Sequence, residues 1–285
     1  MLKRAFIIWL FLLGSLTAFG QEEEGVFWEI VSQDNPQPSY LFGTIHLICE
    51  EDFNINDQVT SALSKTDVLV LEIDMDDPHL QSVMRANLFN KDGQKINDFL
   101  NKEEYEDIRT FLKERTGMDL DMLQEMRPMI LMSLLYNNFL ECETKSFENE
   151  LMLLAKEENV EVAGLETVEN QMSLFDLIPL EDQYESFYTY INDIEKGQEE
   201  FRLLIEAYKH EKISELFEMV SESPEYKDYQ DILLADRNKN WVAPMEKIMK
   251  DSSAFFAVGA GHLAGPEGLI NLLKREGYEV NRIHL

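Results

Sequence analysis

The segment DVLVLEI, residues 67–73, decides the fold of this 285-residue chain. Four consecutive apolar residues, Val68, Leu69, Val70 and Leu71, stand in its middle. A strand with one face in water alternates apolar and polar residues, whereas an unbroken apolar run indicates burial on both faces. Such strands occur in sheets that helices cover on both sides. The segment therefore predicts an α/β fold.

Apolar segments of strand length also lie near both ends of the chain. We expect further strands at residues 26–31, 40–42, 160–163, 254–258 and 278–283. Helical spacing of apolar residues predicts helices at residues 56–65, 103–115, 128–140, 148–158, 180–229 and 266–276. We therefore expect one domain, residues 21–285, with a central sheet built from N- and C-terminal strands. Helices flank this sheet, and a large helical insertion spans roughly residues 78–250.

The first twenty residues are typical of a signal peptide. Lys3 and Arg4 precede an apolar stretch at residues 5–18, and cleavage would fall before Gln21. The stretch is short for a membrane span, although an uncleaved anchor is the alternative. No later apolar run is long enough to cross a bilayer. We expect an exported protein, periplasmic or extracellular, without a stable membrane anchor after cleavage.

The composition is strongly acidic. Asp and Glu number 55 against 25 Lys and Arg, which gives a net charge of −30 at pH 7. Repulsion excludes nucleic acid as a partner and disfavours an anionic membrane surface. The charge either keeps the protein soluble outside the cytosol or attracts cationic peptides or metal ions. Composition does not separate these two uses.

The chain has two cysteines, Cys49 and Cys142. In an oxidising compartment an even pair can form a disulfide. Cys49 also lies three residues after His46, so a role as a metal ligand is an alternative. The usual behaviour of cysteine favours a structural or buried role.

Two turns share one pattern. GTIHL at residues 43–47 and GAGHL at residues 259–263 each follow an apolar strand and place a histidine, His46 or His262, at the same position. Ligands in covered sheets sit beyond the carboxyl ends of the strands, where both histidines are expected. A lone histidine would be ascribed to structure, but a matched pair favours a functional site, as metal ligands or general bases.

A carboxylate is the natural third member of such a site. Glu72 ends the most buried strand and must therefore be paired or coordinate a cation. Asp74 is expected on the same side as Glu72, and the alternative for both is an ion pair with a core arginine. Glu166 also follows a strand, although the start of a helix would favour its charge in any case. Arg237 lies on an apolar helix face, and its expected partners are Glu72, Glu166 or an anionic ligand.

These motifs resemble, in order, those of the TraB/GumN family, which includes the Tiki proteases. The matching segments are YLFGTIH at residues 40–46, LEID at residues 71–74 with Asp77 and Pro78, GLET at residues 164–167 with Glu169 and Gln171, Arg237 with Asn238, and FFAVGAGHL at residues 255–263 with Gly265 and GYEV at residues 277–280. They cover nearly the whole mature chain. The ordered set is far more specific than a single Gly-x-x-His motif.

The resemblance implies both a fold and an activity. The family's fold is similar to erythromycin esterase and to haem-binding ChaN-like proteins. Members of the Tiki branch resemble metal-dependent proteases that manganese or cobalt activates. Their two Gly-x-x-His histidines and the glutamate are essential for activity. By that resemblance, His46, His262 and Glu72 form the active site of this chain.

We therefore expect metal-assisted hydrolysis of a peptide bond in a peptide or protein substrate. His46, His262 and Glu72 would hold a divalent cation (manganese, cobalt or zinc), which lowers the pKa of its bound water toward ~7. Glu72 would be either the third ligand or the general base. Arg237 would stabilise the oxyanion or anchor Glu166.

Three alternatives stay open from the sequence. The same turns could bind haem, a peptide or a signalling ligand without turnover. A metal-independent, esterase-like hydrolase could use the histidines as general bases. A purely structural exported protein would leave Glu72 as a costly buried group with no role beyond an ion pair. No feature of the sequence indicates the oligomeric state.

Overall fold

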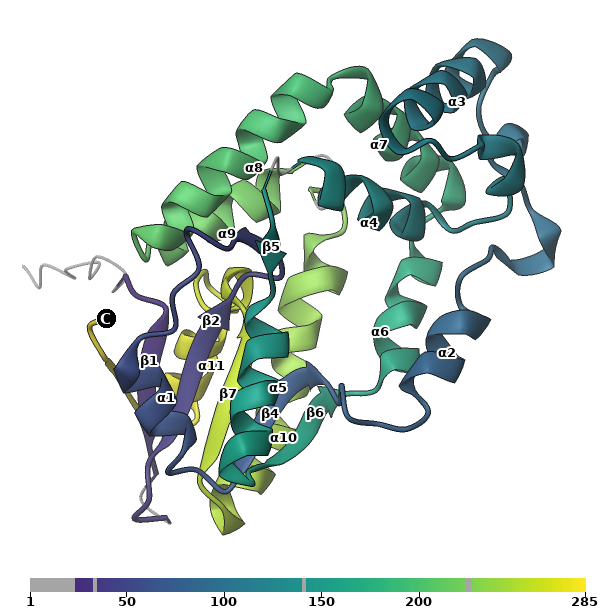
Figure 1. Cartoon of the computed structure of the whole chain (residues 1–285). Helices are drawn as coiled ribbons and strands as arrows, with labels where there is room; N and C mark the ends of the chain where they lie inside the picture. The colour runs from purple at the N-terminus through teal and green to yellow at the C-terminus, as the bar shows by residue number, and fades with distance from the viewer. Residues whose placement is uncertain (1–23, 33–34, 140–141, 224–226) are drawn as a thin grey trace, which may run out of the picture.

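A six-stranded mixed sheet forms the centre of the described part of the chain (Figure 1). The structure, a computed structural model, describes residues 24–32, 35–139, 142–223 and 227–285, so the predicted signal peptide lies outside the described residues. The strand order is β6-β4-β7-β2-β1-β8. Strands β6, β4, β7 and β2 are parallel, and β1 is antiparallel to both β2 and β8. Their bounds are β1 (Phe27–Val31), β2 (Ser39–Thr44), β4 (Val68–Ile73), β6 (Glu161–Glu166), β7 (Ala254–Gly259) and β8 (Glu279–Arg282).

Strand β4 contains the segment from which the fold was predicted. It lies between β6 and β7 and runs parallel to both. Leu69, Val70 and Leu71 are fully or almost fully buried. The strand has a neighbour on each edge and helices over both faces, which explains why its apolar residues do not alternate with polar ones. The predicted α/β class is confirmed.

Helices make up most of the rest of the described chain. The α-helices are α1 (Asp57–Leu63), α2 (Leu80–Ala86), α3 (Lys102–Thr116), α4 (Pro128–Phe139), α5 (Phe147–Glu158), α6 (Val168–Leu174), α7 (Leu180–Asn192), α8 (Ile194–Lys209), α9 (Ile213–Glu222), α10 (Asp236–Asp251) and α11 (Leu269–Arg275). Short helical turns are η1 (Lys91–Gly93), η2 (Ile96–Asp98), η3 (Leu120–Met122), η4 (Phe175–Leu177) and η6 (Ala260–His262), and η5 (Asp231–Ala235) is a π-helix. A small second sheet pairs β3 (Ile48–Cys49) with β5 (Thr144–Lys145).

Side-chain caps define where several helices begin. The Asn101 side chain accepts hydrogen bonds from the backbone N–H groups of Glu103 and Glu104, and the Glu104 carboxylate accepts from the N–H of Asn101. This capping box satisfies N–H groups that the first turn of α3 cannot pair internally. Gly117 ends the same helix with φ of 72°, a left-handed conformation that glycine adopts without strain.

Helices cover both faces of the sheet. In Figure 1, α1 and α5 lie in front of the strands, whereas α10 and α11 lie behind them. The core between these layers is aromatic: Phe42 of β2 packs against Phe147 of α5, with ring centroids 5.7 Å apart. Within the sheet, Phe27 and Phe255 lie 6.0 Å apart. Such buried rings supply a large part of the hydrophobic stabilisation.

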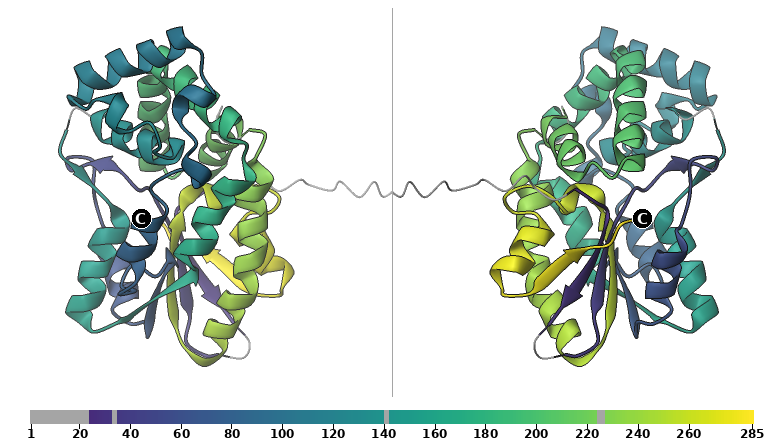
Figure 2. Two further views of the ribbon diagram at one scale, coloured as in Figure 1. Left: turned by 90° about the vertical axis from the view of Figure 1, so that its right-hand side faces the viewer. Right: turned by 90° about the vertical axis from the view of Figure 1, so that its left-hand side faces the viewer.

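A second group of helices lies at one end of the sheet. Figures 1 and 2 show α3, α4, α7 and α8 gathered there. Helices α3, α4 and α7, with the turns η2 and η3, share a second hydrophobic core, made of Ile96, Ile108, Leu112, Leu120, Leu131, Met132, Leu135, Tyr184, Phe187 and Ile191. The buried apolar residues of α8, namely Ile205, Ala207 and Tyr208, belong to the core of the sheet. The range of the predicted insertion, residues 78–250, also contains α5, β6 and α10, which contact one another or β4 in the sheet layers.

The last helix begins later than the sequence predicted. The last helix, expected from residue 266, begins at Leu269. Gly265 has φ of 85°, and the N–H of Gly268 donates to its carbonyl, so a turn precedes the helix.

In the described ranges, every helix is too short or too polar to cross a bilayer.

Candidate functional site

Four parallel strands end at one edge of the sheet, and each end carries a predicted site residue. His46 lies two residues after β2, Glu72 is the penultimate residue of β4, Glu166 is the last of β6 and His262 lies three residues after β7. The carboxyl ends of parallel strands share an edge, so residues far apart in sequence become neighbours there. Arg237, in the first turn of α10, reaches this edge from the layer behind the sheet (Figure 1).

Arg237 holds the two buried carboxylates together. Its Nη2 lies 2.5 Å from Glu72 Oε2 and 2.5 Å from Glu166 Oε1, and its Nε donates to Glu166 Oε1 over 2.9 Å. These are the two partners that the sequence predicted. The guanidinium carbon also lies 4.6 Å from the centre of the Trp241 ring, a cation–π contact. The arginine is therefore fixed on three sides.

The Glu72 carboxylate is fully hydrogen-bonded at this edge. Oε1 accepts from the backbone N–H of Gly259 over 2.9 Å. Oε2 accepts from Arg237 and from the side chain of Gln171 over 3.1 Å. Burial alone would raise the pKa of this carboxyl, but Arg237, His262 and the Gly259 N–H outweigh burial and hold the pKa well below its usual range. Glu72 is ionised at neutral pH.

His262 is buried and fixed through both ring nitrogens. Nδ1 lies 2.7 Å from Asn238 Oδ1, and Nε2 lies 3.1 Å from Arg237 Nη1. Because a guanidinium can only donate, Nε2 accepts and the ring proton is assigned to Nδ1. Burial and the charge of Arg237 together lower the pKa of His262 to about 3, although Glu72 acts in the opposite direction.

His46 has a different environment. Its Nδ1 lies 3.0 Å from Glu148 Oε1, and 70% of its side chain is exposed. Glu148 is nearly buried and also accepts from the hydroxyls of Thr44 and Ser146, over 2.6 and 2.7 Å. The pKa of His46 is raised to about 9, because the carboxylate of Glu148, hydrogen-bonded to Nδ1, and that of Glu72 favour the protonated ring. Nε2 is the nitrogen left for a ligand.

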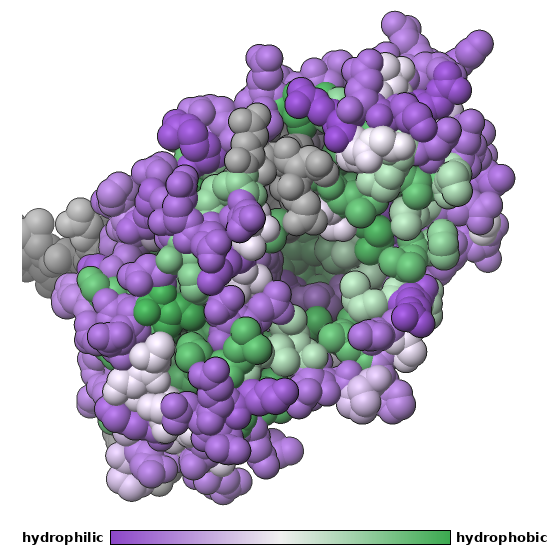
Figure 3. Space-filling model, viewed as in Figure 1, coloured by the Kyte–Doolittle hydropathy of each residue, from purple (hydrophilic) through white to green (hydrophobic). Residues whose placement is uncertain are grey.

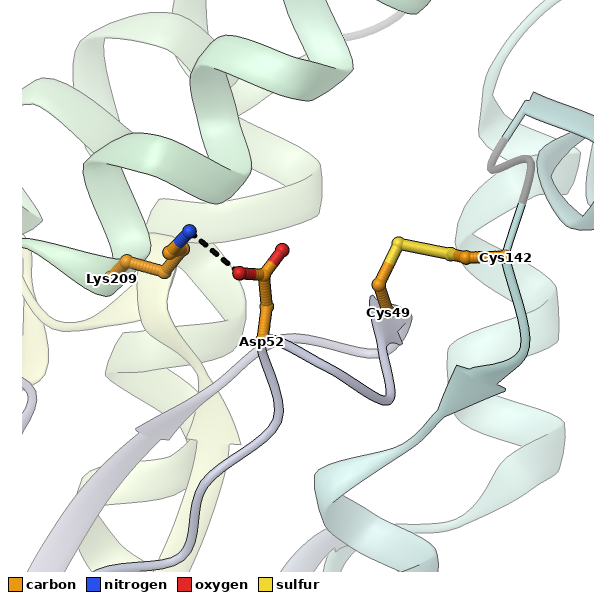
Figure 4. Close-up of a disulfide and its surroundings, with 4 residues drawn as sticks. All are labelled: Cys49, Asp52, Cys142 and Lys209. Carbon is orange, nitrogen blue, oxygen red and sulfur yellow. Dashed lines mark ion pairs between the residues drawn. A yellow bond between two sulfur atoms is a disulfide. The ribbon is translucent and has the colours of Figure 1, made fainter.

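The loop that carries His46 is anchored on both sides (Figure 4). Cys49, three residues after His46, forms a disulfide with Cys142, a pairing that the sequence allowed but left open, and the bond excludes the alternative of Cys49 as a thiolate ligand. On the other side, Asp52 accepts from Lys209 of α8 over 2.6 Å. These contacts join the loop to the segment before α5 and to the helical part of the chain.

The glycines of the two Gly-x-x-His motifs are required for different reasons. A Cβ on Gly43 would lie 2.6 Å from Leu263 Cδ1 and 3.2 Å from Ala260 Cα, so the two turns pack directly against each other. A Cβ on Gly259 would lie 3.3 Å from Glu72 Oε1. Glycine there lets the backbone N–H approach the carboxylate.

Sequence reasoning missed Glu148, the partner of His46. An acidic residue in the first turn of a helix is favoured by the helix dipole and gives no sign of a further role. His46 and Glu148 are 102 positions apart, and only the fold shows that they are neighbours. Asn238 and Gln171 had entered only through the family motifs, without an assigned role.

Three further polar residues, Asp74, His79 and His210, do not contact the strand-end residues described above. Asp74 does not join Glu72: its Oδ1 accepts from the backbone N–H of Asp76 over 3.0 Å, because the chain leaves the sheet at Ile73 and turns. His79 is the N-cap residue directly before α2. His210 is 71% exposed.

A hollow opens in the surface between the sheet layers and the helical part of the chain (Figure 3). Helices α4 and α6 border it, and apolar side chains gather on their side. Gln171 of α6 contacts Glu72, so α6 lies against the strand-end site. Glu72, Glu166 and Arg237 are each only 10–12% exposed, whereas His46 is open to solvent.

The model of the TraB/PrgY/gumN family matches residues 26–282. The chain belongs to the TraB/PrgY/gumN family. This confirms the resemblance that the ordered motifs indicated. Searches among the curated proteins and among the solved structures gave no match.

For a TraB/PrgY/gumN protein with these residues, the donor types fit the divalent metal that the resemblance implies. Two imidazoles and a carboxylate are common ligands of zinc and related metals. Each imidazole is oriented through Nδ1, by Glu148 Oε1 or Asn238 Oδ1, as is usual for metal-binding histidines. In the part of the chain that the structure describes, no three His, Cys, Asp or Glu side chains are already gathered as a ligand set. Arg237 contacts Nε2 of His262, so binding through that atom requires the guanidinium to move.

Proposed function

We propose that this protein is an exported, metal-dependent hydrolase that cleaves peptide bonds, with His46, His262 and Glu72 as the metal-binding residues. The single observation that carries the proposal is the orientation of the two histidines. Both occupy matching turns at adjacent parallel strands, and both have Nδ1 engaged by a side-chain oxygen. Nε2 of His46 is therefore left for a ligand, and Nε2 of His262 can bind one once Arg237 moves away from it. Glu72 lies on the next strand, with Oε1 3.8 Å from His262 Nε2.

A bound divalent cation would supply a hydroxide at neutral pH by lowering the pKa of its water. Metal binding requires neutral imidazole, so His262 is ready as it stands, whereas His46 must release its proton. The low pKa of Glu72 makes it a weak base, because efficient general bases have a pKa near the working pH. This supports Glu72 as a ligand over the general-base alternative.

Arg237 is the cation beside the proposed reaction centre. Its position between Glu72, Glu166 and His262 suits a residue that stabilises negative charge developing on the substrate oxygen. Glu166 then acts as a positioning residue, because it holds the guanidinium through both Nε and Nη2. A guanidinium that leaves His262 Nε2 when a ligand arrives can turn toward that oxygen while Glu166 retains it.

The disulfide and the net charge support the proposed compartment and the proposed substrate. The Cys49–Cys142 disulfide supports export, since disulfides persist in oxidising compartments such as the periplasm or the extracellular space. The net charge of −30 disfavours polyanionic substrates and supports neutral or cationic peptides or proteins.

One observation favours a second candidate, a hydrolase that works without metal. His262 Nε2 already accepts a hydrogen bond from Arg237, so the ring is neutral and held in one tautomer. Such an imidazole could serve as a general base once the guanidinium moves. Chelation separates the two candidates, because only the metal-dependent one loses its activity in chelator.

The test is cleavage of a defined peptide library by purified, oxidised protein, read by mass spectrometry. We expect cleavage with manganese, cobalt or zinc, loss of cleavage in chelator, and loss in both His46→Ala and His262→Ala. His210→Ala, on an exposed face, is the matched control and should keep full activity. Cleavage that persists in strong chelator would establish the metal-free candidate instead. Capture of haem with a Soret band, and no cleavage under any condition, would contradict both.

A further inference from the structure

A cavity of about 230 Å³ lies beside the strand-end site, within the helical part of the chain. Its apolar lining comes from Met129, Met132, Phe175, Ile178, Phe187 and Leu233. A cavity of roughly 150 Å³ with such a lining is enough to bind benzene. The cavity therefore has room for a large apolar side chain.

Two chain segments link this cavity to the site, each by one helical turn. Gln171, which donates to Glu72, is four residues before Phe175 of the cavity wall. Arg237 is four residues after Leu233, and its Nη1 donates to the Leu233 carbonyl over 3.3 Å. Four helical residues advance by about 6 Å along the helix axis, so one helical turn separates the wall residues Phe175 and Leu233 from Gln171 and Arg237, which contact Glu72.

The segment that joins Leu233 to Arg237 includes a π-helix, which is a rare element. Residues Asp231–Ala235 form a π-helix directly before α10, and such segments are frequent at functional sites. The segment places the Leu233 side chain in the cavity wall and the Leu233 carbonyl on the Arg237 guanidinium. A group that fills the cavity therefore packs against the same residue that holds Arg237.

Four polar side chains line the cavity, and three of them, Asp182, Gln183 and Tyr229, pair with neighbouring groups, whereas Ser186 is the fourth. Gln183 Nε2 donates to the carbonyls of Phe175 and Ile178, each over 2.8 Å. The Asp182 carboxylate accepts from the hydroxyl of Tyr229. Because these three side chains already have partners in the protein, the occupant needs no polar atom to pair with them. The lining fits an uncharged apolar group rather than a cation or a phosphate.

From this geometry we propose that the cavity is a specificity pocket for a large apolar side chain of the substrate, of the size of leucine, methionine or phenylalanine. The inference rests on the proposed hydrolase function, because it assigns to that activity a preference for apolar residues near the cleaved bond. It names the substrate class as peptides with a large apolar residue next to the cleavage position. Figure 3 shows a hollow in the surface beside α4, the helix that carries the wall residues Met129 and Met132.

Binding of small probes tests the pocket without requiring activity. The probes are N-acetyl-phenylalaninamide, N-acetyl-leucinamide, N-acetyl-alaninamide and N-acetyl-lysinamide, added to the protein labelled with ¹³C at its methionine methyl groups. We expect saturable shifts of the Met129 and Met132 methyl signals with the phenylalanine and leucine probes. The alanine and lysine probes should leave both signals in place. Equal or larger shifts with the lysine probe would overturn the proposal.

Two substitutions on α7 form a matched pair. Ser186→Trp fills the cavity, because Ser186 lines it, whereas Thr189→Trp adds the same ring on the exposed side of the helix. The first should abolish the methyl shifts and the second should keep them. Met129→Ala, which enlarges the cavity, should strengthen binding of the phenylalanine probe relative to the leucine probe. Unchanged shifts in Ser186→Trp would contradict the assignment.

Cleavage of the peptide library supplies the second readout. Wild-type protein should prefer leucine, methionine or phenylalanine over alanine at one substrate position by roughly tenfold or more, and Ser186→Trp should lose that preference. Methyl shifts without any cleavage would keep the pocket and remove the hydrolase function. Cleavage with no apolar preference and no methyl shifts would remove the pocket alone.

Discussion

Nη1 of Arg237 lies 3.1 Å from Nε2 of His262, the atom through which this histidine would bind a metal. The contact assigns the ring proton to Nδ1, where Asn238 accepts it, and keeps the imidazole neutral. It also sets the order of events at the site, since a ligand can reach Nε2 only when the guanidinium leaves.

The first prediction concerns the protonation of this histidine in metal-free protein. We expect His262 to stay neutral, with its proton on Nδ1, throughout pH 5–8, because burial and Arg237 lower its pKa to about 3. Long-range ¹H–¹⁵N spectra of histidine-labelled protein report the tautomer and the charge directly. A doubly protonated His262 ring at pH 6 would contradict this contact.

A second prediction addresses Glu148, the residue that the sequence did not reveal. Glu148→Gln removes the charge that raises the pKa of His46, so that pKa should fall toward its ordinary value. Loss of such an orienting partner typically weakens metal binding by about 10–100-fold, and we expect this range here. The matched control is Glu157→Gln, which changes an exposed residue of the same helix, α5. Equal pKa values for His46 in both variants would refute the role of Glu148.

The third prediction compares the two Gly-x-x-His turns. Gly43→Ala places a methyl group 2.6 Å from Leu263 Cδ1 in the buried core, and we expect a loss of about 1–3 kcal/mol in the free energy of unfolding. Gly261→Ala brings its Cβ only into ordinary contact with Val220, at 3.6 Å, and should change stability little. Urea denaturation of both variants measures the difference. Equal stability would show that the turns do not pack as described.

The fourth prediction concerns the disulfide. Cys49 and Cys142 are 93 positions apart, so the bond closes a long loop. The double variant Cys49→Ser/Cys142→Ser should lose about 2–5 kcal/mol of stability, as expected when a native disulfide is removed. Reduction of the wild-type protein should produce the same loss. Equal denaturation midpoints for oxidised and reduced protein would contradict a stabilising bond.

Much of the fold could be predicted because the apolar residues of β4 indicate that this strand is buried. An unbroken apolar run at Val68–Leu71 has few solutions other than a strand covered on both faces. The matching turns at His46 and His262 could likewise be placed at strand ends, because each follows an apolar segment and a glycine. The pairing of Arg237 with Glu72 and Glu166 followed from the cost of burying a charge without a partner.

The rest depended on information that a single sequence does not hold. Glu148 and His46 meet only because α5 packs on the sheet near β2, which no local pattern encodes. The turn at Asp74 was missed because alternation within a strand was extended past its end at Ile73. The π-helix at Asp231–Ala235 reads locally as an ordinary helix.

The most direct measurement is calorimetric titration of manganese, cobalt and zinc into the metal-free, oxidised protein. We predict one divalent ion per chain, bound through His46, His262 and Glu72, with binding lost or at least about 100-fold weaker in His262→Ala and unchanged in the His210→Ala control. A wild-type protein that binds none of the three metals, or a His262→Ala variant that binds them equally well, would contradict the proposed metal site.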